Sequence, residues 1–431
     1  MAATTSSLST VYPLGSRVNE RGALEVGGCD VVELAGNFGT PAYALAEDDL
    51  RARARSFMRA LADRSPGGEV LFASKALPCV AVERIFVEEG LGCDVASGGE
   101  LALALRAGFA PDRIYLHGNA KSPEELGHAL QAGVGTIVID NLDELEALAR
   151  LGPEHQRVLL RVTPGVHTDT HASIATGQTD SKFGVALASA PDAIARIAAV
   201  PGLKLAGLHI HLGSQLMDTR VFELAAAAIA SLGEFPVYGL GGGLAAAHVE
   251  GAHPPAIEDF VAAQVAAADR HLGAGRRLVL EPGRSLVANA GVTLYTVMSV
   301  KRSASTWVAV DGGMSDNLRP MLYGAQYEAQ VADRLLQSGG SGEHCVLAGK
   351  HCESGDVIAR DVVLDAPRAG DVVVTPATGA YCHALANNYN GVPRPPVILC
   401  RDGDARVVVR RETYEDLLAR EQPGDDADDG A

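Results

Sequence analysis

The sequence predicts an α/β protein made of a (β/α)8 TIM-like barrel and a separate, mainly antiparallel β domain. The first observation is a regular alternation between about residues 70 and 285, where short apolar runs are separated by longer amphipathic stretches. Short continuous apolar runs between helices are typical of buried parallel strands, and eight such units form a barrel of about 250 residues. The second is a change after about residue 286, where Val and Thr become frequent and Gly and Asp turns separate them, as in antiparallel sheets.

The alternating region supplies all the elements that a barrel needs. The expected strands are the apolar runs 70–74, 93–97, 113–118, 136–140, 158–162, 205–211, 237–241 and 278–283. The expected helices are 80–90, 98–108, 122–132, 141–151, 190–199, 219–232 and 256–272. A doubly wound open sheet is the alternative, but fewer strands are expected in it.

The domain boundaries follow from these patterns. We expect residues 1–37 to add strands to the β domain and residues 38–285 to form the barrel, with an αβ segment at 38–65 as its entry. Residues 286–420 would form the β domain, and residues 421–431 an acidic, disordered tail. The barrel would therefore be inserted between two pieces of the β domain.

Composition and charge exclude several classes of protein. The 431 residues are 47% hydrophobic, which allows a large core and rules out wholesale disorder. The 36 basic and 53 acidic residues give a net charge of −17, which disfavours nucleic-acid binding. No basic, apolar leader and no apolar run of membrane-spanning length is visible, so we expect a cytoplasmic protein without a membrane partner. No CxxC pair occurs among the seven cysteines, which indicates a reducing compartment and no structural zinc: Cys29, Cys79, Cys93, Cys345, Cys352, Cys382 and Cys400.

Polar residues gather where the expected strands end, which is the face of a barrel that carries chemistry. Together they offer a lysine, histidines, carboxylates, arginines and a glycine run: Lys75, Asp94, His117, Asp140, Arg161, His209, His211, Ser214, Gly241–Gly243, Glu281 and Arg284. A barrel does not need this set for its folding. The set therefore indicates an active site at the barrel mouth.

This set of residues suits pyridoxal 5'-phosphate, which needs a lysine, an anion cradle and a partner for its ring nitrogen. Lys75 follows an apolar strand, where desolvation is expected to lower the pKa of the amine and make it nucleophilic. The backbone of Gly241–Gly243, with Ser214 and Arg284, could hold a phosphate, and Glu281 could pair with the ring nitrogen. Each residue also has a simpler interpretation. Lys75 could extend from the barrel rim into solvent, Gly241–Gly243 could be only a turn, and Glu281 could be a carboxylate satisfied at a strand end.

A metal-dependent barrel hydrolase is the rival from another class. His209 and His211 are two residues apart and would share one face of a strand, and His167 and His171 lie nearby in sequence. The long polar segment 163–184 is expected to be a mobile loop at the barrel mouth. Nucleotide-binding glycine motifs are absent from the sequence.

The sequence resembles the fold-type III, pyridoxal-phosphate-dependent decarboxylases from about residue 30 to residue 420. The resemblance rests on blocks that occur in order: FASKA (72–76), GCDVASGGEL (92–101), HIHLGSQ (209–215), GGG (241–243), EPGRSLV (281–287), VDGGMSDNLRPMLYGAQY (310–327), CESGD (352–356) and PATGAYC (376–382). An ordered set of blocks is far more specific than any one of them.

The resemblance implies a role for each matching residue. Lys75 matches the lysine that forms a Schiff base with the cofactor, His211 the histidine that stacks on its ring, and Glu281 the acid at its nitrogen. Cys352 matches the proton donor, which comes from the second subunit of a head-to-tail homodimer. The other implied cofactor contacts are Asp94, Ser214, Gly241, Gly242, Gly243, Gly283, Arg284 and Tyr381, and the implied substrate contacts are Arg284, Arg319, Tyr323, Glu353 and Tyr381.

Individually, several of these residues have simpler interpretations. Cys352 could be an inert buried thiol, Arg319 and Glu353 a surface ion pair, and Tyr381 a packed aromatic residue of the β domain. Their occurrence in ordered blocks favours the catalytic interpretation.

The activity implied is removal of one carboxylate from meso-2,6-diaminopimelate, which gives L-lysine and CO2 and completes lysine biosynthesis. In that interpretation Arg319 grips the distal carboxylate and Glu353 pairs with the distal amine. A same-fold decarboxylase of another basic amino acid, such as ornithine, arginine or carboxynorspermidine, is the alternative, as is a paralogue in a specialised pathway. A catalytically silent paralogue that only binds a cofactor or partner is a further alternative, against which the intact Lys75, Glu281 and Cys352 argue.

Overall fold

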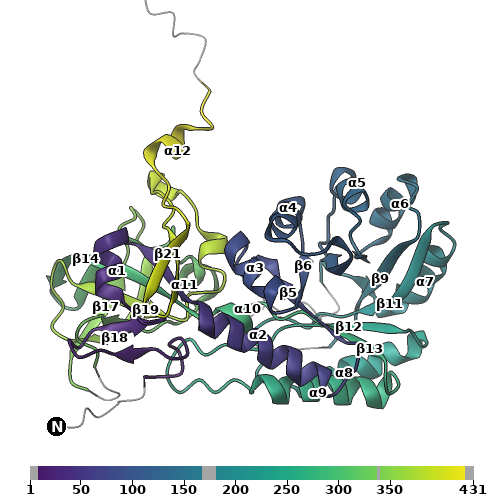
Figure 1. Cartoon of the computed structure of the whole chain (residues 1–431), viewed down its shortest axis with the longest axis horizontal. Helices are drawn as coiled ribbons and strands as arrows, with labels where there is room; N and C mark the ends of the chain where they lie inside the picture. The colour runs from purple at the N-terminus through teal and green to yellow at the C-terminus, as the bar shows by residue number, and fades with distance from the viewer. Residues whose placement is uncertain (1–7, 167–180, 337–339, 423–431) are drawn as a thin grey trace, which may run out of the picture. The chain divides into compact units, whose positions relative to one another are not determined.

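The chain forms two compact units in a computed structural model that describes residues 8–166, 181–336 and 340–422 (Figure 1). The barrel unit consists of Asp48–Ala290 and Gly379–Ala384. The β unit consists of the residues up to Glu47, Gly291–Thr378 and the residues from Leu385 onward.

The barrel unit contains a closed ring of parallel strands, as the sequence predicts. In the described residues its members are β5 (Glu69–Ala73), β6 (Gly92–Val95), β7 (Ile114–Leu116), β8 (Thr136–Ile139), β9 (Gln156–Thr163), β11 (Leu203–His209), β12 (Val237–Gly241) and β13 (Arg277–Leu280). Neighbours in the chain pair in parallel, and β13 returns to pair with β5, which places Val279 opposite Glu69. The short strand β10 (Val185–Ala186) adds to β9 outside the ring.

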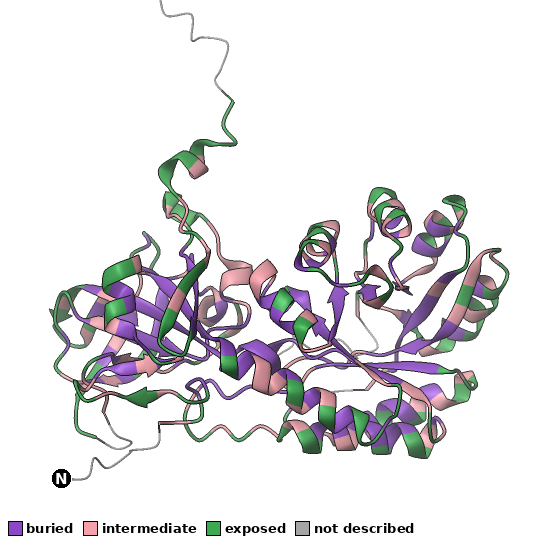
Figure 2. Ribbon diagram, in the orientation of Figure 1, coloured by how far each residue is buried: buried purple, intermediate pink, exposed green. Residues whose placement is uncertain are grey.

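The helices lie outside this ring of strands, with buried inner faces and exposed outer faces (Figures 1 and 2). They are α2 (Glu47–Ala62), α3 (Val80–Glu88), α4 (Gly98–Ala107), α5 (Pro123–Ala132), α6 (Leu142–Arg150), α7 (Ala190–Ala198), α8 (Arg220–Ile229) and α9 (Ile257–His271). The short α10 (Arg284–Val287) also belongs to the barrel unit, but all of its residues are buried. Each helix expected in the alternating region is present, and the stretch 219–232 ends in a separate 3-10 turn, η5 (Ala230–Leu232).

Local sequence explains where the helices begin. Ser97, Ser122 and Asn141 each accept a hydrogen bond at the start of α4, α5 and α6, from the backbone N–H of a glutamate three residues on. Such N-caps satisfy amide groups that a helix leaves without partners. Because these caps follow β6, β7 and β8 closely, they fix the loops that form the barrel mouth.

The barrel interior is a packed core below the mouth. Its members come from seven of the eight strands, one from each: Leu71, Tyr115, Val138, Leu159, Ala206, Val237 and Val279. Inward-pointing side chains fill a barrel in layers, so polar residues are left to the strand ends.

The β unit is built around one long, mixed sheet with strand order β18-β17-β15-β14-β4-β20-β21, on which β19 pairs with β14 and β16 with β19. Its strands are β4 (Ala42–Ala46), β14 (Gly291–Arg302), β15 (Thr306–Val310), β16 (Gln330–Val331), β17 (Glu343–Ala348), β18 (Val357–Leu364), β19 (Val372–Pro376), β20 (Val397–Arg401) and β21 (Asp404–Val409), with helices α11 (Arg319–Tyr323) and α12 (Tyr414–Leu418). Most pairs are antiparallel, as expected, but β15 pairs with β17 and β4 with β20 in parallel.

The expected domain boundaries differ from the observed ones in three places. The barrel unit ends its main segment at Ala290, and not at the expected residue 285. The strand in the expected entry segment 38–65 is β4, which pairs with β14 and β20 and so belongs to the β unit. Residues 379–384 lie inside the expected β domain, yet they belong to the barrel unit because backbone bonds join them to it, for example from Gly379 N–H to the Ala288 carbonyl.

The N-terminal segment was expected to add strands to the β domain, and this prediction is only partly right. Strands β1 (Arg17–Val18), β2 (Leu24–Val26) and β3 (Cys29–Asp30) form their own small sheet within the β unit. The end of the segment forms helix α1 (Val31–Phe38), because the Asp30 carboxylate accepts the N–H groups of Val32 and Glu33 and starts a helix.

Three sequence expectations fall partly or wholly outside the described residues. The segment 163–184, expected to be a mobile loop, is described only at its two ends. His167 and His171 lie outside the described residues, as does the acidic tail from residue 423. In the part of the chain that is described, no helix is long and apolar enough to cross a membrane.

Candidate active site

Lys75 lies at the carboxyl end of β5, in the 3-10 turn η1 (Ser74–Ala76). Its side chain is exposed, whereas Asp94, His117, Glu281 and Arg284 around the same barrel mouth are each less than a tenth exposed. The amine is therefore accessible inside a ring of closed-off charged groups. A cofactor that attaches to a lysine through an aldehyde carbon requires an accessible amine of this kind.

The structure corrects the expected electrostatics of Lys75. Desolvation by the surrounding barrel mouth lowers the pKa of this amine, as predicted, but the negative charges of Asp94, Tyr381 when ionised, and Glu281 outweigh it, so the pKa of Lys75 is raised. The cation of Arg161 opposes them only in part. Without a ligand, Lys75 is consequently an ammonium group held among carboxylates, and its reactivity cannot be attributed to desolvation alone.

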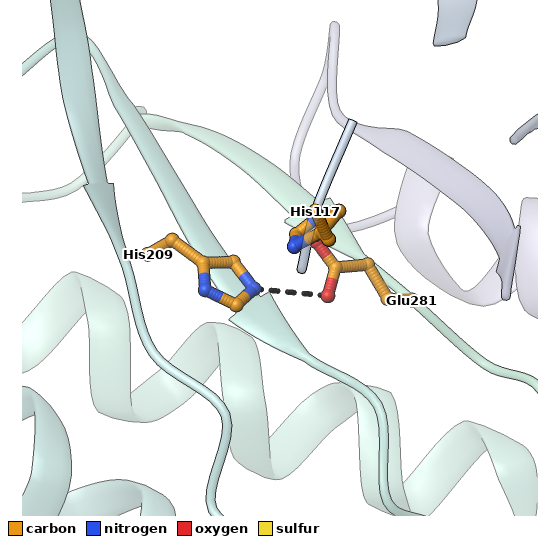
Figure 3. A group of neighbouring side chains, drawn as sticks. All are labelled: His117, His209 and Glu281. Atoms are coloured by element: carbon orange, nitrogen blue, oxygen red, sulfur yellow. Dashed lines mark hydrogen bonds and ion pairs between the residues drawn. The ribbon is translucent and has the colours of Figure 1, made fainter. Parts of the chain in front are cut away.

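Glu281 lies just after β13 and is clamped by two imidazoles (Figure 3). His209 Nε2 lies 2.9 Å from Oε2 of Glu281, and His117 Nε2 lies 3.2 Å from Oε1. The side chains of His117 and His209 are at most 8% exposed, and their rings meet edge to face with centroids 4.8 Å apart. Because His209 is the last residue of β11, and His117 and Glu281 directly follow β7 and β13, the closed barrel itself assembles this triad.

The triad has a defined charge distribution. Burial raises the pKa of the Glu281 carboxyl, but the two histidines lower it by more. The resulting pKa is well below the usual value, so the group is a carboxylate. Burial lowers the pKa of His117, but Asp94 and Glu281 outweigh this effect and raise it. Burial dominates at His209 and lowers its pKa, so that ring is neutral. A carboxylate held in this way can accept a hydrogen bond from a protonated ring nitrogen.

His211 and His209 do not act as the pair that a metal site would need. Strand β11 ends at His209, and the group of potential ligands that the described residues bring together is His117, His209 and Glu281 without His211. Burial lowers the pKa of His211 to well below its usual value, and the cations of Lys75 and Arg161 add to this effect. A neutral imidazole beside Lys75 can lie against an aromatic cofactor, as the resemblance implies.

Arg284 and Ser214 form the charged part of an anion cradle. The Ser214 hydroxyl lies 3.2 Å from Nε and 3.1 Å from Nη2 of Arg284. The glycine run beside them cannot carry side chains: a Cβ on Gly242 would lie 2.1 Å from the Glu281 carbonyl oxygen, and one on Gly243 would lie 2.5 Å from that of Gly213. The backbone at this point is therefore bare, which suits a phosphate group.

Tyr381 and Gly283 belong to the same mouth. The Arg284 guanidinium lies over the Tyr381 ring at 4.6 Å, and the Tyr381 N–H donates to the Ala76 carbonyl at 2.8 Å. Tyr381 is therefore not the packed β-domain aromatic of the simpler interpretation. Gly283 packs against the lysine turn, since a Cβ there would lie 3.1 Å from those of Ala73 and Ala76.

Cys352 and Glu353 lie on the β unit, in the loop between β17 and β18. Both residues are exposed, so Cys352 is not an inert buried thiol. Hydrogen bonds tie this loop to Asp356, whose carboxylate accepts the backbone N–H groups of His351 at 2.9 Å and Met314 at 2.7 Å and lies 2.7 Å from His351 Nδ1. The Cys352 N–H donates to Asn390 at 2.9 Å.

Arg319 and Tyr323 are the first and last residues of α11, also on the β unit. Arg319 is only 4% exposed and contacts the Tyr327 hydroxyl, so it is not the surface ion-pair residue of the simpler interpretation. Tyr323 is half-buried. The expected substrate-binding residues thus fall on both units, with Arg284 and Tyr381 in the barrel unit.

Sequence reasoning noted His117 and Arg161 at strand ends but gave them no role, and it considered His209 only as a ligand in the rival metal-site interpretation. Arg161 Nη1 lies 3.7 Å from Asp140, and its guanidinium lies over the Phe183 ring at 4.5 Å. The sequence marks each of these residues as polar within or after an apolar strand. Which carboxylate each one faces depends on contacts between strands far apart in the chain.

The features of the barrel mouth meet the three needs of pyridoxal phosphate: an accessible amine, a cradle for an anion and an acid for the ring nitrogen. The donor set therefore fits this cofactor. The fold and the site together define a pyridoxal-phosphate-dependent barrel enzyme.

Comparison with known proteins agrees with this conclusion. Residues 47–288 match the family described as "Pyridoxal-dependent decarboxylase, pyridoxal binding domain". The chain is 51% identical to a diaminopimelate decarboxylase of Actinosynnema pretiosum subsp. auranticum, over 95% of both chains. The structure resembles that of diaminopimelate decarboxylase from M. jannaschii in co-complex with L-lysine, with a TM-score of 0.89 and 30% identity over 97% of this chain and 99% of that one.

A more distant solved structure is that of a lysine/ornithine decarboxylase complexed with cadaverine from Vibrio vulnificus. It has a TM-score of 0.74 and 25% identity over 86% of this chain and 98% of that one. The chain belongs to the diaminopimelate decarboxylase family of pyridoxal-phosphate-dependent decarboxylases.

Proposed function

We propose that this chain removes one carboxylate from meso-2,6-diaminopimelate to give L-lysine and CO2, the last step of lysine biosynthesis. The observation that carries the proposal is the 51% identity, over nearly the full length, to a protein named for this reaction. The site adds chemical support, because Lys75, Glu281 and Cys352 are all present in suitable environments.

In the proposed mechanism the barrel unit holds the cofactor and the reacting end of the substrate. Bound pyridoxal phosphate supplies a ring that takes up the electron pair released when the bond from Cα to the carboxylate breaks. Lys75 Nζ would be the attachment point of the cofactor, and the neutral His211 would lie against its ring. Arg284 and Ser214 would bind the phosphate, and Glu281, kept ionised by His117 and His209, would accept a hydrogen bond from the protonated ring nitrogen.

The proton that replaces the lost carboxylate comes from the β unit in this proposal. As CO2 leaves, Cys352 Sγ–H donates its proton to Cα, and the resulting thiolate regains a proton from solvent. The overall change is diaminopimelate plus one proton to lysine plus CO2. The exposed position of Cys352 on a loop held by Asp356 suits a donor that must meet a substrate.

Arg319 and Glu353 make the proposal specific for a substrate with a second amino-acid end. A guanidinium binds a carboxylate bidentately, and a carboxylate pairs with an ammonium group. A decarboxylase of ornithine or arginine has no distal carboxylate to bind, so the buried cation of Arg319 favours diaminopimelate.

We further propose that the enzyme is a homodimer in which Cys352 of a second copy serves the barrel of the first. The cytoplasm is the proposed location, because all seven cysteines are free thiols, as in reducing compartments. The test of the activity is release of CO2 and formation of lysine from meso-diaminopimelate by the loaded enzyme, in equal amounts. Loss of substrate without lysine would contradict the proposed reaction.

The shared site has a separate test, the mixing of two inactive variants, Lys75→Ala and Cys352→Ala. Random mixing makes half of the dimers mixed, and each mixed dimer has one intact site of two, so about a quarter of wild-type activity should return. If all residues of a site come from one chain, no activity returns.

A further inference from the structure

The turn that carries Lys75 is tied to its surroundings on both sides. On one side, the Ser74 hydroxyl donates to Oε1 of Glu83 on α3 at 2.7 Å. On the other, the Ala76 carbonyl accepts the Tyr381 N–H at 2.8 Å. Ser74 and Ala76, on either side of Lys75, are therefore both held by hydrogen bonds. Of these three residues, Lys75 is the one that is exposed.

Glu83 is an unusual residue for its position. It lies on the buried face of α3 between Val82, Ile85 and Phe86, and neither Glu83 nor Ser74 has any exposed surface. Among the described residues, Oε2 of Glu83 has no hydrogen-bond partner. A carboxylate buried without a cation is costly, and a buried polar group usually has a specific bond to make.

The charge state of Glu83 follows from this environment. Burial raises the pKa of the carboxyl to about 7, against the lowering effect of the Ser74 hydroxyl, and the nearby Glu100 raises it further. Glu83 thus presents a neutral acid to Ser74 under mildly acidic conditions. A neutral acceptor can orient the Ser74 hydroxyl without adding another negative charge behind Lys75, which already faces Asp94 and Glu281.

We propose that Glu83 is a positioning residue for Lys75, acting through the Ser74 hydroxyl to hold the turn in which the cofactor-bearing lysine sits. The proposal rests on the proposed function only in assigning the cofactor to Lys75. When the tether is lost, the turn loosens and Lys75 Nζ moves relative to the carboxylates of Asp94 and Glu281, whose charges favour its protonated form.

The test compares Ser74→Ala, Glu83→Ala, the double variant and Glu83→Gln as pyridoxal-phosphate-loaded proteins. The main measurement is the pH midpoint of the visible absorbance band that depends on Lys75. Loss of the hydrogen bond between Ser74 and Glu83 should lower this pH midpoint by roughly half a unit to one unit and should lower kcat by about 3- to 10-fold. The two single variants and the double variant should shift equally, because all three remove the same bond. Glu83→Gln should keep the wild-type midpoint, since its amide oxygen still accepts from Ser74.

Two controls separate positioning from general stability and from the proposed function. Ser122→Ala removes a helix-capping hydroxyl elsewhere in the barrel and should lower Tm without moving the band. Lys75→Ala should lack the lysine-dependent band; if it keeps the band, the assignment of the cofactor to Lys75 fails. A wild-type midpoint in Ser74→Ala, or additive shifts in the double variant, would overturn the positioning proposal alone. Ser74→Ala removes a single oxygen atom, so it decides the question even if Glu83→Ala fails to fold.

Discussion

Replacement of Glu281 by Gln tests whether the carboxylate, and not merely the shape of this side chain, organises the barrel mouth. The carboxylate lies 2.9 Å from His209 Nε2 and 3.2 Å from His117 Nε2, with 3% of its own side chain exposed. Gln has nearly the same volume and keeps one acceptor oxygen, but it has no charge. The pKa of His117 is therefore the quantity that should respond.

The size of the response follows from the 3.2 Å separation. Two unit charges at that distance interact by about 1.3 kcal/mol even with the dielectric constant of water, and by about 5 kcal/mol at an effective constant of 20. The smaller figure corresponds to about one pKa unit. Glu281→Gln should thus lower the pKa of His117 by at least about one unit, although Asp94, 3.7 Å away, still raises it.

The assay is an NMR titration of histidines labelled with 13C at Cε1, with the His117 signal assigned by loss in His117→Asn. Glu83→Gln is the matched control, because it also removes a buried barrel carboxyl but lies in no contact with His117. An unchanged His117 pKa in Glu281→Gln would refute the proposed electrostatic triad.

Glu281 and His117 also predict how the free energy of unfolding depends on pH. The raised pKa of His117 means that its stabilising contribution is full below its ordinary pKa of 6.5 and is lost as pH rises through the folded value. The lowered pKa of Glu281 means that its contribution is present above 4.5 and is lost as pH falls through the folded value. The difference in unfolding free energy between wild type and Glu281→Gln should therefore be largest between about pH 5 and 6.5 and should shrink toward pH 8.

Three further predictions concern the cofactor and the proton donor. Lys75→Ala should abolish the borohydride-reducible chromophore of the loaded enzyme, and an unchanged chromophore would reject Lys75 as the attachment point. Cys352→Ala should lower kcat by about 10²- to 10⁴-fold while the visible spectrum shows cofactor still bound, and near-normal turnover would remove Cys352 as the essential acid. Loss of the charged phosphate contact in Arg284→Met should weaken cofactor binding by roughly 10- to 150-fold in Kd, measured by equilibrium dialysis, whereas Ser214→Ala should have a smaller effect because it removes a neutral partner.

The strands and helices of the barrel were predictable because their signals are local. Val70, Leu71 and Phe72 form a continuous apolar run bounded by turns, and Ser122 with Glu125 marks the start of a helix. The assignment of β4 was not predictable in this way. Its residues, Ala42–Ala46, are fully buried like those of a barrel strand, and only pairing with β14 and β20, far away in sequence, places them in the β unit.

The site was predictable as a set of residues but not as a set of contacts. Lys75 and Glu281 stand out because each follows an apolar strand, and motif resemblance adds Cys352 and Arg319. The roles of His117 and His209 depend on which strands close the barrel next to β13. The sign of the Lys75 pKa shift depends likewise on the carboxylates it faces, which is why desolvation alone predicted the wrong direction.

The claim at the centre of this account is that the barrel and the residues of the β unit together select a diamino acid with a second amino-acid end. The most direct measurement is a competition assay in which the loaded enzyme receives equal concentrations of meso-diaminopimelate, ornithine, arginine and lysine, while CO2 and all four amino acids are followed. The account predicts that only diaminopimelate is consumed and that lysine and CO2 appear in equal amounts. Consumption of ornithine or arginine in preference to diaminopimelate would contradict it.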